Sequence, residues 1–146
     1  YWEEKFLSVL LPMKLVPGGS ILANCNHGTQ GLLNCFVLSA EDNIYSITKL
    51  VSDAVLTTKF RGGVGINIGS QGQKGYIRPK GAPFQDGKAL GPCAVLDMVS
   101  ENSKKITTGN KARRGAFLFS MDWRHPDIWE FIQAKTQSTI DAQITK

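Results

Sequence analysis

The stretch LLNCFVLSAEDNIYSITKLVSDAVLTTKFRGGVGINI, residues 32–68, decides the fold of this chain. It opens with an almost unbroken apolar run over 32–38, which predicts a short strand buried on both faces. A helix is expected over 44–58, because apolar residues recur there at helical spacing and polar residues just before it can cap its start. A second strand, flanked by glycines, is expected over 64–68. Strand, helix and strand in this order are typical of an α/β fold with parallel strands.

More regular elements follow along the rest of the chain. Between Gly69 and Gly91, glycine and proline are too frequent for long helices or strands, so a functional loop is expected there. Pro92 is tolerated in the first turn of a helix. The other expected elements are a helix within 2–15, a loop over 23–31, helices over 93–105 and 125–135, and a strand over 116–121.

The chain carries an excess of positive charge. Its 17 lysines and arginines outnumber 12 aspartates and glutamates, which gives a net charge of +5. A basic cluster binds nucleic acid, binds the phosphates of a nucleotide, or is only a solvated face, and spacing alone leaves these alternatives open. Because no aromatic residues are interleaved with the basic ones, nucleic acid is the weaker interpretation. The cluster consists of Lys104, Lys105, Lys111, Arg113 and Arg114.

The three cysteines, at positions 25, 35 and 93, include no Cys-x-x-Cys pair. An odd count without such a pair argues against a disulfide framework and against a structural zinc site, so no metal site is expected. The sequence shows no apolar run of membrane-spanning length and no charged-then-apolar leader. We therefore expect a soluble cytoplasmic protein without a membrane partner.

The glycines over 62–69 match neither common phosphate-binding motif. The dinucleotide fingerprint would need a glycine where Ile68 stands. Around Gly87 and Lys88, a P-loop would need a glycine in place of Ala82, and a serine or threonine after the lysine. The glycines then allow a close approach to the backbone, either by the chain itself or by a ligand.

Six short blocks occur in order along the chain. They are PGGS at 17–20, NCFV at 34–37, GGVGIN at 62–67, RPKGAP at 78–83, RRGA at 113–116 and HPDI at 125–128. In this order they resemble the large catalytic subunit of ribonucleotide reductases, most closely the adenosylcobalamin-dependent class. The resemblance implies that residues 1–146 are a single partial domain without an internal boundary, the first part of a ten-stranded α/β barrel.

The resemblance implies a redox role for Cys35. In the family this thiol faces the ribonucleotide substrate and forms a disulfide with a partner thiol, which on the family pattern lies beyond residue 146. Ser20, Asn34 and Gly63 are implied as substrate contacts. Without the resemblance, Cys35 would be read as a buried, inert thiol and Ser20 as a turn hydroxyl that bonds its own backbone.

The resemblance also implies a second site, for a deoxynucleoside triphosphate effector. Asp42, Arg78, Lys111 and Arg113 match positions that surround the effector in the family, and a guanidinium suits phosphate oxygens. The alternatives are a helix cap for Asp42 and a solvated loop charge for Arg78. His125 is expected to have a structural role at the start of its helix.

The resemblance has further implications for the complete enzyme. The resemblance implies adenosylcobalamin as cofactor, a thioredoxin-like reductant, and a remainder of the reductase that carries the radical cysteine in an Asn-Pro-Cys-Gly-Glu segment. It leaves a homodimer open, and it implies that this chain alone is inactive. Two rival hypotheses are a noncatalytic nucleotide-binding module that keeps the effector site, and a basic RNA-binding domain.

Overall fold

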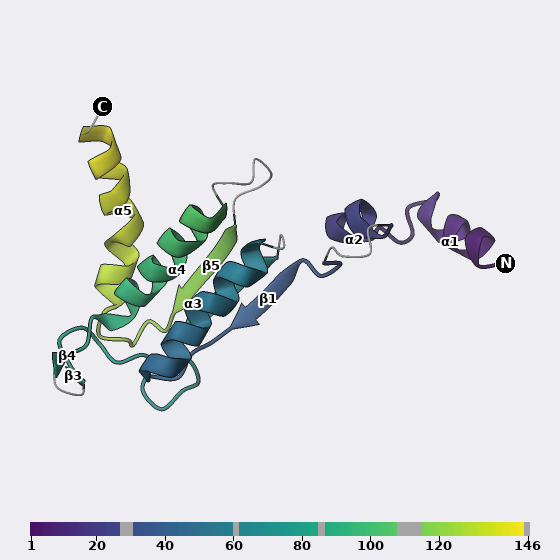
Figure 1. Ribbon diagram of the computed structural model, residues 1–146. Coiled ribbons are helices and arrows are strands. Elements are labelled where there is room, and N and C mark those ends of the chain that lie inside the picture. The colour runs from purple at the N-terminus through teal and green to yellow at the C-terminus, as the bar shows by residue number, and fades with distance from the viewer. Residues whose placement is uncertain (27–30, 60–61, 85–86, 108–114, 145–146) are drawn as a thin grey trace. The chain divides into compact units, whose positions relative to one another are not determined.

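The computed structural model describes the chain except residues 27–30, 60–61, 85–86, 108–114 and 145–146, and in addition it leaves out the side chains of residues 107 and 137–144. The described residues form two compact units, 1–34 and 35–146, and each is presented by itself. The single partial domain over 1–146 stays a prediction. Figure 1 shows the elements of both units.

The first unit consists of two helices, α1 (Trp2–Leu10) and α2 (Gly19–Asn24). Helix α1 ends before Pro12, earlier than the expected limit at 15, because proline disrupts a helix interior. Helix α2 was not expected from the sequence. The Gly18 carbonyl accepts hydrogen bonds from the backbone N–H groups of Ile21 and Leu22 and so starts this short helix.

The second unit contains a three-stranded parallel sheet in the order β1-β2-β5. Its strands are β1 (Cys35–Leu38), β2 (Gly63–Ile68) and β5 (Ala116–Met121). Helices α3 (Ile44–Lys59) and α4 (Gly91–Thr107) connect them and lie side by side over the sheet (Figure 1). The α/β fold with parallel strands is confirmed, whereas the ten-stranded barrel stays a prediction.

Two further elements complete the second unit. Helix α5 (Ile128–Ile144) begins three residues later than expected, because a turn over 122–125 precedes it. A small antiparallel pair, β3 (Pro83–Phe84) with β4 (Gly87–Lys88), lies within the segment expected to be a loop. That segment therefore has more regular structure than its glycine and proline content predicted.

Among the described residues, helices cover one face of the sheet and leave the other open. On β2, Val64, Ile66 and Ile68 are 1–2% exposed and pack in the core with residues of α3 and α4. On the opposite face Val37 is 84% exposed and Leu118 is 73% exposed. The expectation that the first strand is buried on both faces is therefore wrong for the described part of the chain.

The start of α3 differs in detail from the sequence interpretation. Ile44, in the first turn of the helix expected over 44–58, is 51% exposed, whereas Leu50 is 2% exposed and lies in the core. The side-chain oxygen of Asn43 accepts a hydrogen bond from the Ser46 backbone N–H at 2.9 Å. Asn43, and not Asp42, therefore caps this helix.

Within the described ranges, no helix is both long enough and apolar enough to cross a membrane. The same ranges hold no cluster of three or more histidine, cysteine or carboxylate side chains that could bind a metal ion.

Candidate functional site

Cys35 lies on the open face of the sheet, at the first position of β1. It is in register with Gly63 on β2, which is in turn in register with Ala116 on β5. A thiol, a residue without a side chain and a methyl group thus follow one another across the sheet. The thiol is free and exposed, so the buried-thiol alternative is wrong for the described chain. This row leaves room beside the Cys35 sulfur for a ligand or another part of a larger protein.

Gly65, two residues further along β2, has no structural need to be glycine. A Cβ added there would meet nothing closer than the Phe36 carbonyl oxygen at 3.8 Å, which is ordinary contact. At Gly62, by contrast, a Cβ would lie 2.7 Å from the Thr57 methyl carbon and 2.9 Å from the Phe36 ring. Packing within the chain therefore explains the glycine at position 62. Gly65 instead leaves the open face of the sheet without a side chain at that position.

A hydrogen-bonded polar pair lies on the open face near the C-terminal ends of β2 and β5. The Ser120 hydroxyl donates a hydrogen bond to the Asn67 side-chain oxygen at 2.8 Å, and both side chains are exposed. The sequence interpretation did not single out these two residues. Their signal was present, since polar residues interrupt two otherwise apolar strands, but only the strand register places them side by side.

The two other expected substrate contacts, Ser20 and Asn34, belong to the first unit. Ser20 lies within α2, and Asn34 packs against Gly18, where an added Cβ would come within 2.5 Å of the Asn34 side-chain nitrogen. The structure does not place them relative to Cys35, so their roles as substrate contacts stay predictions.

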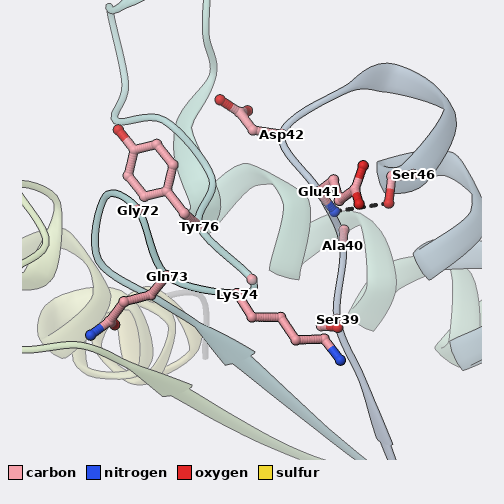
Figure 2. Close-up of a pocket in the computed structure, with 10 residues that line it drawn as sticks. Ser39, Ala40, Glu41, Asp42, Ser46, Gly72, Gln73, Lys74 and Tyr76 are labelled. Carbon is pink, nitrogen blue, oxygen red and sulfur yellow. Dashed lines mark hydrogen bonds between the residues drawn. The ribbon is translucent and has the colours of Figure 1, made fainter.

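A pocket of about 550 Å³ lies where β1 ends, beside the turn that follows β2. Figure 2 shows its lining side chains, with Asp42 and Tyr76 on one side and Lys74 and Ser39 on another. The Ser46 hydroxyl accepts a hydrogen bond from the Glu41 backbone N–H at 2.8 Å and fixes the chain at the pocket wall. The lining residues are Ser39, Ala40, Glu41, Asp42, Ser46, Gly72, Gln73, Lys74, Gly75 and Tyr76.

Asp42 and Arg78, two of the predicted effector residues, are in direct contact. The Arg78 Nε donates to the Asp42 Oδ2 at 2.6 Å, although the residues are 36 positions apart. The Arg78 Nη1 donates to the Pro83 carbonyl at 2.6 Å, and the guanidinium lies 4.6 Å from the centre of the Phe84 ring. Both alternatives are therefore wrong: Asp42 does not cap α3, and Arg78 is ion-paired and only 31% exposed.

Lys74 is a pocket residue that sequence reasoning missed. Its side chain lines the pocket, and the described residues provide it with no ion pair. The available signal was a lysine within the glycine-rich segment over 69–75. The other two predicted effector residues, Lys111 and Arg113, lie outside the described residues.

The third cysteine has different surroundings from Cys35. Cys93 lies in the first turn of α4 and is 8% exposed. Burial, assisted by the negative charges of Glu130 and Asp127, raises the pKa of the Cys93 thiol to about 11. Because the thiolate is the reactive form, Cys93 is suited to packing and not to thiol exchange at neutral pH.

Comparison with known proteins gives a consistent family assignment. Residues 33–145 match the family described as "Ribonucleotide reductase, barrel domain". The chain is 30% identical over 139 residues to a vitamin B12-dependent ribonucleoside-diphosphate reductase of Mycobacterium tuberculosis, which covers 94% of this chain and 19% of that protein. It is likewise 30% identical over 137 residues to a protein of the same name from Thermoplasma acidophilum, with 92% and 17% covered.

More distant relatives carry another name. A ribonucleoside-diphosphate reductase subunit alpha of Chlamydia muridarum is 24% identical over 143 residues, which are 97% of this chain and 13% of that protein. The chain thus spans at most about a fifth of the length of these curated relatives.

Proposed function

Because this chain belongs to the ribonucleotide reductase barrel-domain family, we propose that it forms part of the substrate site and the effector site of a reductase that converts ribonucleotides to deoxyribonucleotides. The observation that carries the proposal is the exposed thiol of Cys35 on the open sheet face, in register with Gly63. The relatives are named as diphosphate reductases, so a ribonucleoside diphosphate is the first substrate to test.

The reaction needs two electrons, and a dithiol supplies them. A thiyl radical elsewhere in the complete protein takes the 3′ hydrogen of the ribose, and the 2′ hydroxyl then leaves as water. Cys35 and a partner thiol outside residues 1–146 give up two hydrogen atoms and form a disulfide, and the 3′ hydrogen returns to the sugar. The sum is ribonucleotide plus dithiol giving deoxyribonucleotide, disulfide and water. A thioredoxin-like reductant resets the disulfide by thiol exchange.

The chain's own contribution is to position the ribose beside the Cys35 sulfur. Gly63 and Ala116 carry little or no side chain across the sheet from that sulfur, which allows a sugar to approach closely. Ser20 and Asn34 would contact the substrate from the first unit.

The pocket beside Asp42 would hold a deoxynucleoside triphosphate effector. Arg78 is not among the residues that line this pocket, but its Nε bonds Asp42, which is, and its guanidinium would bind a phosphate beside the pocket. Lys74 adds a positive charge at the pocket wall. Lys111 and Arg113 would complete the site, and a homodimer would place the effector between two subunits. The complete protein would work in the cytoplasm.

Adenosylcobalamin would supply the initial radical in the complete protein, as the names of the relatives suggest. The described residues do not fit a cobalt-binding role. His125 is 1% exposed, and both of its ring nitrogens are bonded within the chain. We therefore place the cofactor in the remainder of the protein and derive no step through it from this chain.

The test is turnover by the complete reductase with a dithiol protein as reductant. Cys35→Ser should abolish multiple turnover, because serine cannot form the disulfide. Cys25→Ser is the matched control, since Cys25 is also exposed but follows helix α2 and is not part of a strand, and it should keep turnover. Undiminished turnover by Cys35→Ser would reject the assignment of Cys35. A wild-type protein that binds triphosphates but reduces no nucleotide would favour the noncatalytic nucleotide-binding module.

A further inference from the structure

The segment before α5 carries a buried histidine whose two ring nitrogens are both bonded. His125 Nε2 lies 2.8 Å from the Ile77 carbonyl oxygen, and its Nδ1 lies 3.1 Å from the Asp127 backbone nitrogen. A carbonyl only accepts and a backbone N–H only donates. With these partners, Nδ1 accepts from the Asp127 backbone N–H and Nε2 donates to the Ile77 carbonyl. This bond joins the residues before α5 to Ile77, which directly follows the pocket residue Tyr76 in the sequence.

Asp127 makes a second connection to the same segment, at Lys80. Its carbonyl accepts from the Phe131 backbone N–H, which places it at the N-cap of α5. An N-cap side chain usually bonds its own helix, but the Asp127 Oδ2 instead accepts from the Lys80 backbone N–H at 2.8 Å. Gly91 makes room for this carboxylate. A Cβ on Gly91 would lie 2.9 Å from the same oxygen.

Arg78 lies between these two attachment points. Its backbone is held by His125 through Ile77 on one side, and by Asp127 through Lys80 on the other. Ile77 is 3% exposed and belongs to the core, so the segment is also anchored by packing. From this backbone position, the Arg78 guanidinium contacts the Asp42 carboxylate at 2.6 Å.

We infer that Asp127 and His125 are positioning residues for the effector site: they hold the backbone on both sides of Arg78 and so fix its guanidinium for phosphate binding. This inference rests on the proposed effector site and extends it to α5, which contributes none of the residues that line the pocket. The tightness of triphosphate binding then depends on a helix outside the pocket.

The experiment measures the dissociation constant of deoxythymidine triphosphate for the complete reductase by equilibrium dialysis. Asp127→Ala should weaken binding by about three- to tenfold, the usual worth of one hydrogen bond. Asp127→Asn keeps a side-chain oxygen for the Lys80 N–H and should restore binding to within about twofold. Lys80→Ala is the matched control. It removes the exposed ion pair with Glu130 at 3.0 Å but keeps the backbone N–H, so binding should stay unchanged.

A double-mutant cycle separates positioning from general damage. In an Arg78→Ala background, Asp127→Ala should cause no further loss, because Asp127 acts through Arg78. If Asp127→Ala is insoluble, Asp127→Ser keeps a helix-capping side chain that is too short to reach Lys80, and the same results are expected of it.

The outcomes distinguish the inference from the proposal beneath it. Wild-type protein that binds no deoxynucleoside triphosphate would overturn the effector site itself. Normal binding by wild type and by Asp127→Ala alike, or equal losses with and without Arg78, would overturn the positioning role alone.

Discussion

At the scale of single residues, the two cysteines of the second unit have opposite properties. Cys35 is exposed on the open sheet face, whereas Cys93 is 8% exposed, with the pKa of its thiol raised to about 11. Burial disfavours the thiolate, and the neighbouring carboxylates Glu130 and Asp127 disfavour it further. The fold thus keeps one thiol available for exchange and the other protonated.

This difference predicts the order of alkylation in the complete, reduced protein. At pH 8 iodoacetamide should modify Cys35 well before Cys93, as measured by mass spectrometry of their peptides. Modification of Cys93 should rise only as the pH approaches about 11. The folded pKa lies above the ordinary value of 9.0, so the stabilising contribution of the protonated thiol is present below pH 9 and is lost between pH 9 and 11. Guanidine-unfolded protein, in which both thiols react alike, is the control, and rapid labelling of native Cys93 at pH 8 would contradict this account.

How much of the site the sequence could predict depends on what each residue contacts. Asp42 and Arg78 were singled out because the resemblance to ribonucleotide reductases implies them as effector residues, and the structure joins them at 2.6 Å. Asp127 lies in the HPDI block at the start of an expected helix, and its bond to Lys80, 47 positions away, could not be predicted from the local pattern. Lys74 was missed for the same reason, since pocket walls form from segments that are distant in the chain.

At the scale of elements, the strands and helices of the second unit could be predicted well, because apolar periodicity reports burial against the core. The strand expected over 116–121 has those bounds in the structure, and the helix expected over 44–58 extends by one residue. Helix α2 was missed because its six residues are too few to show a period and begin at Gly19. The exposure of one face of β1 was not predicted. An apolar run in the sequence does not show whether helices cover one face of a strand or both.

Two glycines, one on β2 and one in the turn after it, should respond differently to substitution by alanine. Gly75 has a φ of +81°, and an added Cβ would lie 2.5 Å from the Asn67 carbonyl oxygen. Gly75→Ala should therefore destabilise the complete protein by about 2 kcal/mol or more. Gly65→Ala meets no atom closer than 3.8 Å and should leave the unfolding midpoint unchanged, while lowering turnover through the methyl group it adds to the open face. Denaturant unfolding and steady-state assays measure both, and equal losses of stability would contradict the distinction.

At the scale of the whole molecule, the second unit has an unfinished surface. Strands β1 and β5 are the two edges of the sheet, and one sheet face lacks a covering layer within the described residues. A largely apolar pocket of about 760 Å³ lies beside β5, between α4 and α5. Unpaired strand edges and exposed apolar side chains favour association with other chains.

The isolated 146-residue chain is therefore expected to self-associate, which size-exclusion chromatography with light scattering would measure. Leu118→Lys should reduce association, because Leu118 is 73% exposed on the open sheet face. Leu90→Lys is the matched control, since Leu90 is 71% exposed but lies outside the sheet, and it should leave association unchanged. A monomeric wild-type chain would contradict the expectation.

The alternation along β2 has a consequence for how this protein can evolve. The core limits the volume of the side chains at Val64, Ile66 and Ile68. One branched apolar residue can therefore replace another there with little loss of stability. Gly63 and Gly65 lie on the open face, so the limit there is set by whatever approaches that face. Any substitution at these positions adds side-chain atoms, whether the new side chain is polar or apolar. Within a single strand, selection thus acts on alternate positions for unrelated reasons, and a lineage that changed its chemistry could rewrite one set while leaving the other intact.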